Sequence, residues 1–335
     1  MGVTIADVAR LADVGRGTVS RVLNDRVNVD PATRARVLAA IKELDFVPNP
    51  TARRLSLRRT QTVAVILPFL TRPSSVERLR GMEITLAAGG YDLIVFNVET
   101  VDRRDAVFRD LPRRERVDGL VIVSLSPNVS EFKRIERSGL PTVLVDAHHR
   151  GLPCVVADDV LGGRLAAQHL IDLGHRRIGF IGDIPDTPLA FVSSRLRLTG
   201  VRRAVTDAGF RLPASLVGIG DHSRRRATEL ATRMLTTALP PTGIVCASDT
   251  QAAGVLEAAS QLGLHVPGDL SVTGYDDLEL ADHLGITTIR QPLFESGVRA
   301  VQRLLHSLQG GPPEPLREVQ DINLVVRRTT APPAV

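Results

Sequence analysis

The spacing of apolar residues changes near residue 61, and the change divides the sequence into two parts. Before this point, apolar residues recur at intervals of three and four, which is typical of amphipathic helices. After it, short continuous apolar runs alternate with helical stretches, which is typical of buried parallel strands connected by helices. The pattern therefore predicts a small helical module followed by an α/β body.

The apolar runs of the body form two successive series. The first series predicts helices between its strands, with strands at 63–67, 93–96, 120–123 and 142–145 and helices at 76–89, 102–114 and 129–138. The second series predicts strands at 178–181, 216–219, 243–246 and 270–273 and helices at 161–173, 193–208, 223–237 and 249–263. Two doubly wound parallel sheets in tandem enclose a cleft, and such sheets bind ligands at the carboxyl ends of their strands.

Three helices are predicted within the first 45 residues. The first begins at Thr4, whose hydroxyl we expect to accept the amide of residue 7. The second covers residues 16–23 after a break at 13–15, and the third begins behind an N-cap at Asp30 and ends near Leu44. The residues expected to face a shared core are Ile5, Val8, Ala9 and Ala12, then Val19, Val22 and Leu23, then Val37, Leu38, Ile41 and Leu44. Two helices joined by a tight turn, the second of them basic, form a helix-turn-helix.

Positive charge is concentrated in this module. Residues 1–60 hold eleven Lys and Arg against six Asp and Glu, whereas residues 61–335 hold 31 of each, so the first part accounts for the net charge of +5. Charge alone fits DNA, RNA, a membrane surface or heparin equally well. The helix-turn-helix favours DNA, because Arg16 and Arg21 project from the second helix and an arginine reads guanine for about 1–3 kcal/mol. The alternative is a three-helix bundle that binds nothing.

A short segment after the third helix has two interpretations. Asn49 and Pro50 can begin a helix that is too short to be stable alone, and Leu55 stands among arginines with no obvious core to enter. Minor-groove proteins insert such apolar side chains between base steps. The alternative is an ordinary linker in which Leu55 packs against the next domain.

Three motifs resemble the lactose/galactose repressor (LacI-type) family of bacterial transcriptional regulators. They are residues 3–9 (VTIADVA), 18–24 (TVSRVLN) and 46–49 (FVPN), supported by Ala52 and Leu55, and the resemblance extends over essentially the whole chain. It implies a cytoplasmic homodimer that binds double-stranded DNA at a near-palindromic operator, with the second helix in the major groove and paired hinge helices in the minor groove. The DNA-binding residues it implies are Thr4, Arg16, Gly17, Thr18, Ser20, Arg21, Asn24, Asn49, Ala52, Arg53 and Leu55. Gly15, Gly17 and Phe46 depart from the family pattern, so base selection should depend on Arg16 and Arg21.

The resemblance also implies the domain organisation. Residues 1–48 form the helix-turn-helix domain, 49–60 a hinge helix and linker, 61–328 a two-lobed body of the periplasmic-binding type and 329–335 a tail. The first lobe comprises about 61–157 and 291–321, and the second about 158–290 and 322–328. Segment 293–308 would return to the first lobe. We refer to residues 1–48 as the headpiece.

Polar residues at strand ends and helix starts mark the expected effector site. A guanidinium facing carboxylates across a cleft suits a ligand with vicinal hydroxyls. The alternative is a set of salt bridges and helix caps that join the lobes, although Arg197 and Asp276 match effector-binding positions of the family. The expected effector-binding residues are Phe69, Asp146, Ser193, Arg197, His222, Ser248 and Asp276. We expect a sugar or sugar derivative, with a purine or nucleoside as the second choice.

Other chemistry finds little support in the sequence. The sequence contains no Gly-x-Ser-x-Gly nucleophile elbow, no Walker loop and no His-Glu-x-x-His zinc-protease motif. We therefore expect no enzyme activity, no cofactor and no metal. Cys154 and Cys246 are isolated and should pack as small apolar residues. No apolar run approaches the ~20 residues that span a bilayer, and the start carries no secretion leader. A secreted sugar-binding transport protein remains the alternative for the body, but it would require a leader and have no use for the headpiece.

Overall fold

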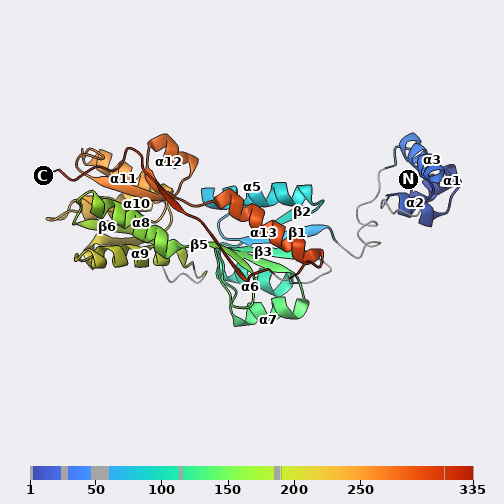
Figure 1. The fold of residues 1–335 in the computed structure, drawn as a ribbon, viewed down its shortest axis with the longest axis horizontal. Coiled ribbons are helices and arrows are strands. Elements are labelled where there is room, and N and C mark those ends of the chain that lie inside the picture. Colours follow the sequence, from blue (N-terminus) through green and yellow to red (C-terminus); the bar gives the residue numbers. More distant parts are fainter. Residues whose placement is uncertain are drawn as a thin grey trace. The chain divides into compact units, whose positions relative to one another are not determined.

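The structure is a computed structural model that describes residues 3–23, 29–46, 60–112, 116–184, 189, 191–312 and 314–334. Contacts within the chain divide it into two compact units, Met1–Thr60 and Gln61–Val335. The first unit is helical, and the second contains two β-sheets, each covered by helices (Figure 1). The predicted fold class, a helix-turn-helix headpiece with two doubly wound lobes, is confirmed.

Three helices form the headpiece: α1 (Ile5–Leu11), α2 (Arg16–Leu23) and α3 (Pro31–Glu43). Their shared core consists of Val8, Ala9, Ala12, Val19, Val22, Val37 and Ala40. The prediction for Leu38 is wrong, since this side chain is 52% exposed. The inward positions of α3 follow the spacing of Val37 and Ala40, with Ile41 packed beside them, and Leu38 lies off this stripe.

The caps of two headpiece helices are polar. The carboxylate of Asp30 accepts the amide of Thr33 at 3.0 Å, and Pro31 occupies the first helical position. At α1, Thr4 and Asp7 form a capping box, so the expected pairing of the Thr4 side chain with the amide of residue 7 is present. The Thr4 hydroxyl donates to the Asp7 carboxylate at 2.7 Å, and the same carboxylate accepts the Thr4 amide at 3.0 Å. These two hydrogen bonds lower the pKa of Asp7.

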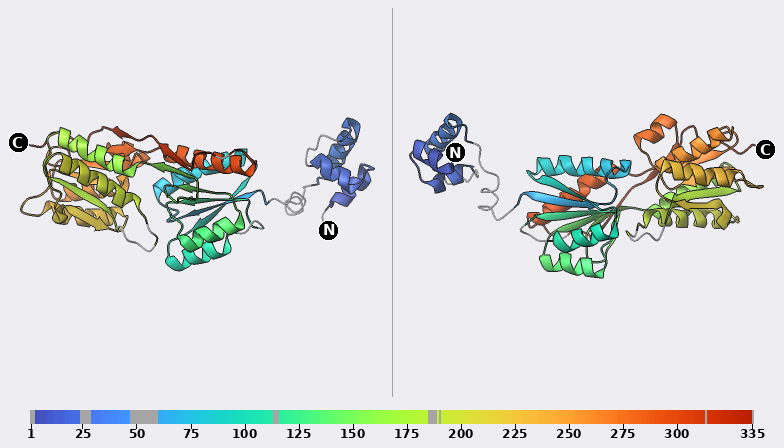
Figure 2. Two further views of the ribbon diagram at one scale, coloured as in Figure 1. Left: turned by 60° about the horizontal axis from the view of Figure 1, so that its bottom comes forward. Right: turned by 180° about the vertical axis from the view of Figure 1, so that it is seen from behind.

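The first lobe contains a six-stranded sheet in the order β11-β5-β4-β3-β1-β2, in which every neighbouring pair is parallel. Its strands are β1 (Thr62–Leu67), β2 (Asp92–Asn97), β3 (Gly119–Val123), β4 (Thr142–Val145), β5 (Cys154–Ala157) and β11 (Arg317–Gln320). Helices α5 (Pro73–Ala88) and α13 (Leu293–Leu308) cover one face, and α6 (Val101–Asp110) and α7 (Val129–Ser138) cover the other (Figures 1 and 2). Helix α6 ends at Asp110, ahead of Pro112, rather than at the expected residue 114.

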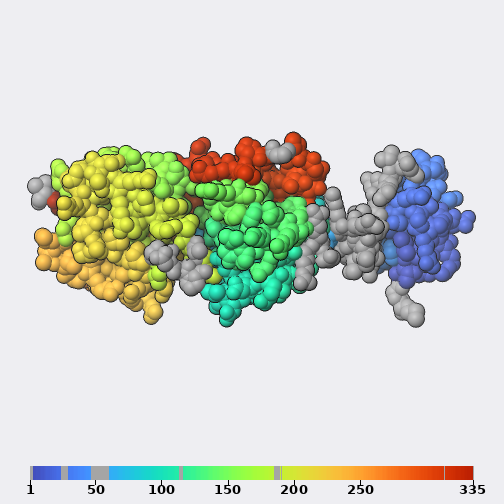
Figure 3. Space-filling model, turned by 90° about the horizontal axis from the view of Figure 1, so that it is seen from below, coloured from blue at the N-terminus to red at the C-terminus, as the bar shows by residue number. Residues whose placement is uncertain are grey.

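The side chains of β1 show how the pleat builds two cores in this lobe. Val63, Val65 and Leu67 pack against α5 and α13, whereas Ala64 and Ile66 pack against α6 and α7. Because both faces are covered, all six residues of β1 are buried and the strand appears in the sequence as a continuous apolar run. The teal and green atoms of α6 and α7 form much of the first lobe's surface in Figure 3.

The second lobe repeats this plan with the strand order β12-β10-β9-β8-β6-β7. Its strands are β6 (Ile178–Asp183), β7 (Val217–Gly220), β8 (Gly243–Cys246), β9 (Ser271–Asp276), β10 (Thr287–Arg290) and β12 (Asn323–Val325). All pairs are parallel except β10–β12, which is antiparallel. Its helices are α8 (Asp159–Asp172), α9 (Ser193–Asp207), α10 (Arg224–Leu235), α11 (Asp249–Gln261) and the short α12 (Glu279–Leu284).

Two cores flank the second sheet as well. Val245 packs with residues of α8 and α9, and its neighbours Ile244 and Cys246 pack with α10 and α11. Helices α8 and α9 cross so closely that a Cβ on Gly163 would lie 2.0 Å from the carbonyl oxygen of Arg197. Glycine at this crossing thus sets the position of the helix that carries Arg197.

The chain passes between the lobes at segments that are distant in sequence. Strand β5 ends in the first sheet before α8 begins the second lobe, and β10 ends in the second sheet before α13 packs beside α5 in the first (Figures 1 and 2). Strands β11 and β12 then add to the first and second sheets in turn. The periodicity analysis identified neither β5, β10, β11 nor β12.

Membrane insertion finds no support among the helices. None of those in the described part of the chain combines the length and apolar character needed to cross a bilayer.

A buried histidine joins the C-terminal tail to the second lobe. His175 is 1% exposed, and its ring nitrogens lie 2.9 Å from Thr242 Oγ1, 3.0 Å from Ser271 Oγ and 2.9 Å from the carbonyl oxygen of Ala331. Thr329 adds a hydrogen bond to the carbonyl oxygen of Val272. Burial lowers the pKa of His175, although the Ala331 carbonyl opposes the shift. The neutral imidazole is therefore the form that fits the fold.

We expect the stability contributed by His175 to fall at acidic pH. Its folded-state pKa lies below the unfolded value of about 6.5, so the unfolded chain binds the proton more tightly as the pH falls below that value. His175→Asn should be less stable than the wild type at pH 8, and the difference in melting temperature should narrow between pH 7.5 and 5.5. Melting curves across this range measure it. A difference that stays constant or widens would contradict the assignment.

Candidate functional site

One face of α2 presents the cationic residues of the helix-turn-helix. Val19 and Val22 turn into the headpiece core, whereas Arg16, Gly17 and Arg21 are exposed. At 100° per residue, Gly17 and Arg21 lie on the side of the helix opposite the buried valines, and Arg16 lies at the margin of that side. The helix thus presents two guanidinium groups to solvent from a rigid base, which is the arrangement that base-edge contacts in a major groove require.

The backbone at Gly17 is also open. No atom lies within 4 Å of the place that a Cβ would occupy at this position. Thr18 and Ser20 are half-buried at the margins of the same face, and Thr4 is exposed at the start of α1. The remaining expected DNA-binding residues, Asn24, Asn49, Ala52, Arg53 and Leu55, lie outside the described residues.

The second candidate site is a cleft between the two lobes of the body. Its volume is about 60 Å³, below the roughly 300–1,000 Å³ of most ligand pockets. Five of the seven expected effector-binding residues line it, namely Asp146, Ser193, Arg197, His222 and Asp276. Asp146 comes from the first lobe and the other four come from the second, as the strand-end rule for doubly wound sheets predicts.

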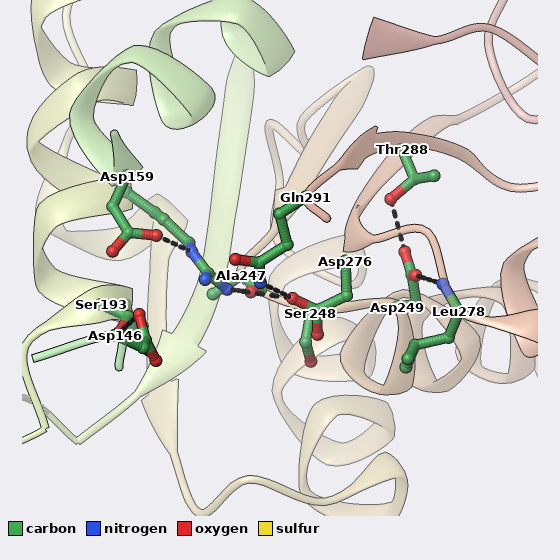
Figure 4. Close-up of polar contacts among 12 residues, drawn as sticks. Asp146, Asp159, Ser193, Ala247, Ser248, Asp249, Asp276, Leu278, Thr288 and Gln291 are labelled. Atoms are coloured by element: carbon green, nitrogen blue, oxygen red, sulfur yellow. Dashed lines mark hydrogen bonds and ion pairs between the residues drawn. The ribbon is translucent and has the colours of Figure 1, made fainter. Parts of the chain in front are cut away.

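Arg197 is the most constrained of these residues. Its Nε donates to Asp159 Oδ1 at 2.8 Å and its Nη1 donates to the carbonyl oxygen of Ala247 at 2.5 Å, while Asp276 Oδ1 lies 3.8 Å from Nη1 (Figure 4). The guanidinium also stacks 3.5 Å from the ring centroid of Tyr275. Burial opposes the charged form, but Asp159 together with Tyr275, Asp276 and Asp146 outweighs it, and the pKa of Arg197 lies above its usual range. Arg197 is thus a permanent buried cation.

Burial also shifts the pKa values of the acidic groups around Arg197. Desolvation raises the pKa of Asp159 to about 6 despite the opposing charge of Arg197. Burial likewise raises the pKa of Asp276, with Arg197 again opposing the shift. Because removal from water disfavours each isolated charge, these carboxylates depend on the guanidinium between them.

A chain of polar contacts continues from Asp276 to the first lobe. Gln291, at the passage from β10 to α13, donates from Nε2 to Asp276 Oδ1 at 2.5 Å (Figure 4). Its Oε1 lies 3.4 Å from Nη2 of Arg78 on α5, and the same Nη2 lies 3.6 Å from Asp146 Oδ2. A change at Arg197 can therefore reach α5 through contiguous polar contacts.

Asp146 joins the lobes by a second route. Its Oδ2 accepts the hydroxyl of Ser124 at 2.7 Å within the first lobe, and its Oδ1 accepts the hydroxyl of Ser193 from the second lobe at 3.3 Å. The length of the second hydrogen bond indicates that it is the weaker of the two. A ligand hydroxyl at this place would compete with the weaker contact.

An acid–histidine pair forms another wall of the cleft. Nδ1 of His222 lies 3.0 Å from Asp183 Oδ1, and Gln251 donates from Nε2 to the same oxygen at 2.8 Å. Burial alone would raise the pKa of Asp183, but the hydrogen bond from His222 and nearby positive charge lower it. Since Asp183 is ionised, the hydrogen of this contact lies on Nδ1 of His222.

Unusual backbone conformations gather at these strand ends. Phe69, Ser124, Asp146, Asp276 and Asp277 all have positive φ, between 50° and 108°. Non-glycine residues adopt this region at a cost, and such residues cluster at ligand sites. The turns that follow β1, β3, β4 and β9 are thus shaped to direct side chains rather than to relax the backbone.

The other two expected effector-binding residues have structural roles. Ser248 caps α11, accepting the amide of Gln251 at 3.2 Å, and is 2% exposed. Phe69 is outside the cleft lining, but its ring lies 5.9 Å from that of Phe191 and beneath the guanidinium of Arg72. Next to Ser248, Asp249 accepts Thr288 Oγ1 at 2.6 Å and the Leu278 amide at 2.8 Å (Figure 4), and burial raises its pKa to about 8.

Several lining residues were missed by the sequence reasoning. They are Arg72, Ser75, Arg78, Ser124, Asp183 and Gln291. Ser124 and Asp183 could have been found, because each stands at the carboxyl end of a predicted strand. Gln291 had no such signal, since strand β10 itself was not recognised. Among the described residues, no cluster of His, Cys, Asp or Glu has the arrangement of a metal site, and Cys154 and Cys246 are both buried and free.

Comparison with known proteins decides the family. The description "Bacterial regulatory proteins, lacI family" matches residues 4–49, and "Periplasmic binding protein-like domain" matches 167–330. The ribose operon repressor of Escherichia coli (strain K12) is 37% identical over 311 residues, covering 91% of this chain and 93% of that protein. The chain belongs to the LacI family. It is therefore a DNA-binding transcriptional regulator rather than an enzyme.

Solved structures of LacI-family regulators agree with this assignment. The lac repressor dimer bound to operator and the anti-inducer ONPF is 28% identical, with a TM-score of 0.87 over 99% of this chain and 100% of that one. A complex of the transcriptional regulator CelR with cellobiose is 31% identical, with a TM-score of 0.73 over 98% of this chain and 99% of that one. The alternative of a transport-type binding protein is wrong, because residues 4–49 of the headpiece region match the DNA-binding regulatory proteins of the lacI family.

Replacing Arg197 should destabilise the second lobe. Arg197→Met leaves Asp159 and Asp276 buried without their cation, and breaking such a pair costs about 3–5 kcal/mol. Adding Asp159→Asn should recover part of the loss, because it removes the stranded charge. Urea unfolding measures the free energy of unfolding of the wild type, of Arg197→Met and of the double variant. The exposed neighbour Arg195→Met serves as the control. The interpretation fails if Arg197→Met costs no more than Arg195→Met.

Proposed function

We propose that this protein is a repressor that binds a near-palindromic operator as a homodimer and changes its operator affinity when a sugar or sugar derivative occupies the interlobe cleft. The observation that carries the proposal is the cleft itself, where hydrogen bonds from both lobes meet at Asp146 and Asp276. A ligand with several hydroxyls can replace or extend these contacts. We place the protein in the cytoplasm, where its DNA partner is found.

The DNA-binding part of the proposal assigns base reading to Arg16 and Arg21 and backbone contacts to Thr4, Thr18 and Ser20. Gly17 allows close approach, since it has no side chain. In this proposal the domain limits stay as the family resemblance gives them: headpiece 1–48, hinge 49–60, body 61–328 and tail 329–335. Asn24 completes the headpiece contacts, and Asn49, Ala52, Arg53 and Leu55 supply those of the hinge.

Apolar surface on the first lobe supports a dimer. Strand β2 forms one edge of its sheet and exposes Ile94, which is 44% accessible. Val76 and Ile84 of α5 are 42% and 54% accessible. Exposed apolar side chains beside an unpaired sheet edge favour association with a second copy. The lac repressor named above is a dimer on its operator, and two half-sites would add their binding energies here in the same way.

Coupling between ligand and DNA follows from the contacts that cross the lobes. The small cleft volume means that a sugar must change the separation of the lobes or move their side chains to enter. The polar chain from Arg197 through Gln291 to Arg78 would carry that change to α5 in the first lobe. The coupling free energy should be about 1–3 kcal/mol, and it should be reciprocal between ligand and operator.

The proposal is tested by operator binding with and without ligand. A genomic-fragment selection with the full chain should return a near-palindromic site. Adding sugars and, as the second class, purines and nucleosides should change affinity for that site by about 5–150-fold for one compound. A protein that selects no site, or whose site affinity is indifferent to every compound, would overturn the corresponding half of the proposal.

Arg21→Ala should reduce both affinity and base preference. Loss of a bidentate contact to guanine costs about 1–3 kcal/mol and relaxes selection at that base pair. Arg10→Ala is the matched control, because Arg10 is 78% exposed on α1 and pairs with Asp7. The control should leave the selected sequence unchanged. Selection from randomised sites compares them, and an unaltered motif for Arg21→Ala would remove that residue from base reading.

A further inference from the structure

The guanidinium of Arg72 lines the interlobe cleft, and no hydrogen-bonding partner for it lies among the described residues. Its Cζ lies 4.3 Å from the ring centroid of Phe69 and 5.4 Å from that of Phe191, so two aromatic rings hold it in place. None of the described residues forms a hydrogen bond or ion pair with this side chain. Stacking on rings satisfies the faces of a guanidinium but leaves its N–H groups, which lie in its plane, available.

Arg72 stands at the start of α5, where the helix points its amino end toward the cleft. Pro73 occupies the first turn, no acidic residue follows in that turn, and no side chain caps the helix. Ser74 and Ser75 line the cleft beside Arg72. The Ser75 amide already donates to the carbonyl oxygen of Arg72 at 2.9 Å, so this end of the helix attracts an anion mainly through the positive end of the helix dipole.

A second arginine on the same helix face supplies an independent observation. Arg78 lies one turn beyond Ser75, lines the cleft and has a side chain that is only 5% exposed. Its buried Nε has no hydrogen-bond partner among the described residues, and its Nη2 contacts to Gln291 and Asp146 are long, at 3.4 and 3.6 Å. A buried N–H without an acceptor is unfavourable unless a ligand completes it.

The acids of the cleft already have other hydrogen-bond partners, although Asp146 also lies 3.6 Å from Arg78 and the charges of Asp183 and Asp276 act on Arg72. Asp146 accepts hydroxyls from Ser124 and Ser193. Asp183 is bound by His222 and Gln251, and Asp276 by Gln291 with Arg197 beside it. Each carboxylate therefore has partners already, whereas none of the described residues accepts a hydrogen bond from the Arg72 side chain or from Nε of Arg78.

We propose that the effector carries an anionic group, a phosphate or a carboxylate, which binds Arg72, the serine-lined amino end of α5 and Arg78. This inference rests on the proposed function, since it specifies the ligand of the same cleft. The anion would sit at the first-lobe wall, while the sugar hydroxyls face Asp146, Asp276 and Arg197. Planar bidentate contact is the reason that an arginine suits this role.

The test uses matched ligands and matched variants of the full chain. Ligand sets comprise a neutral sugar, its phosphate ester and its aldonate, namely ribose with ribose 5-phosphate and ribonate, and glucose with glucose 6-phosphate and gluconate. Inorganic phosphate alone is the probe that does not depend on the sugar. Arg72→Gln removes the unpaired guanidinium, and Arg80→Gln is the control, since Arg80 is 61% exposed on α5 and pairs with Glu77.

We expect inorganic phosphate at 10 mM to raise the melting temperature of the wild type and of Arg80→Gln by about 2 °C or more, and to leave Arg72→Gln unchanged. Calorimetric titration should show at least tenfold tighter binding of one anionic member than of its neutral parent, and Arg72→Gln should abolish that preference. The anionic member preferred, ester or aldonate, identifies the group.

Two outcomes separate this inference from the proposed function. Release or tightening of the operator by a neutral sugar, with no phosphate effect and no anionic preference, would overturn the inference and keep the function. Failure of every compound, phosphate included, to bind a protein that still selects its operator would overturn both the anionic site and the effector role of the cleft.

Discussion

The body of this regulator is organised around a permanent cation in its interior. The guanidinium of Arg197 contacts the start of α8 through Asp159, the segment after β8 through the Ala247 carbonyl, and the end of β9 through Asp276 and Tyr275. A buried charge is tolerated only when it is paired and hydrogen-bonded. The segments that supply those partners are therefore held in one arrangement, and the cleft inherits its shape from them.

This constraint explains why the cleft is suited to regulation as well as to binding. Its polar groups come from both lobes, and those at the centre are connected through Gln291 to Arg78. A ligand that changes one of these contacts alters the balance between two arrangements of the lobes rather than a single side chain. The close crossing of α8 and α9 at Gly163 places the backbone of Arg197 directly against α8.

The headpiece must hold its charged helix α2 in a fixed position with only a small core. Its core is built from small side chains, mainly valine and alanine, which lets three short helices pack closely. The charged residues of α2 then have only one face available to them, the one opposite the buried valines. Cationic side chains on a rigid helix meet the geometric demand of a groove, whereas the same residues on a flexible chain would supply charge without register.

Local patterns in the sequence were sufficient for the helix-turn-helix, the buried central strands and the family. Continuous apolar runs identified β1, β3, β4 and β8, because both faces of those strands are covered. The short edge strands β11 and β12 carried no such pattern, since polar residues are tolerated there, and Leu38 was assigned to a core that its position on α3 does not reach.

Strand-end position identified Asp146 and Asp276 as candidates, and a helix start together with the family resemblance identified Arg197, but the sequence could not assign their partners. Only the tertiary structure places Arg78 from α5, Gln291 from the returning segment and Asp183 from β6 around the same small space. The apolar pattern shows how a segment packs within its own layer, whereas a site whose residues lie as far apart as the 213 positions between Arg78 and Gln291 depends on how the layers pack against each other. That is why the sequence determined the architecture and the carriers of charge, and the fold alone decided that Arg197 is enclosed by acids while Arg72 stacks on Phe69 with no hydrogen-bonding partner among the described residues.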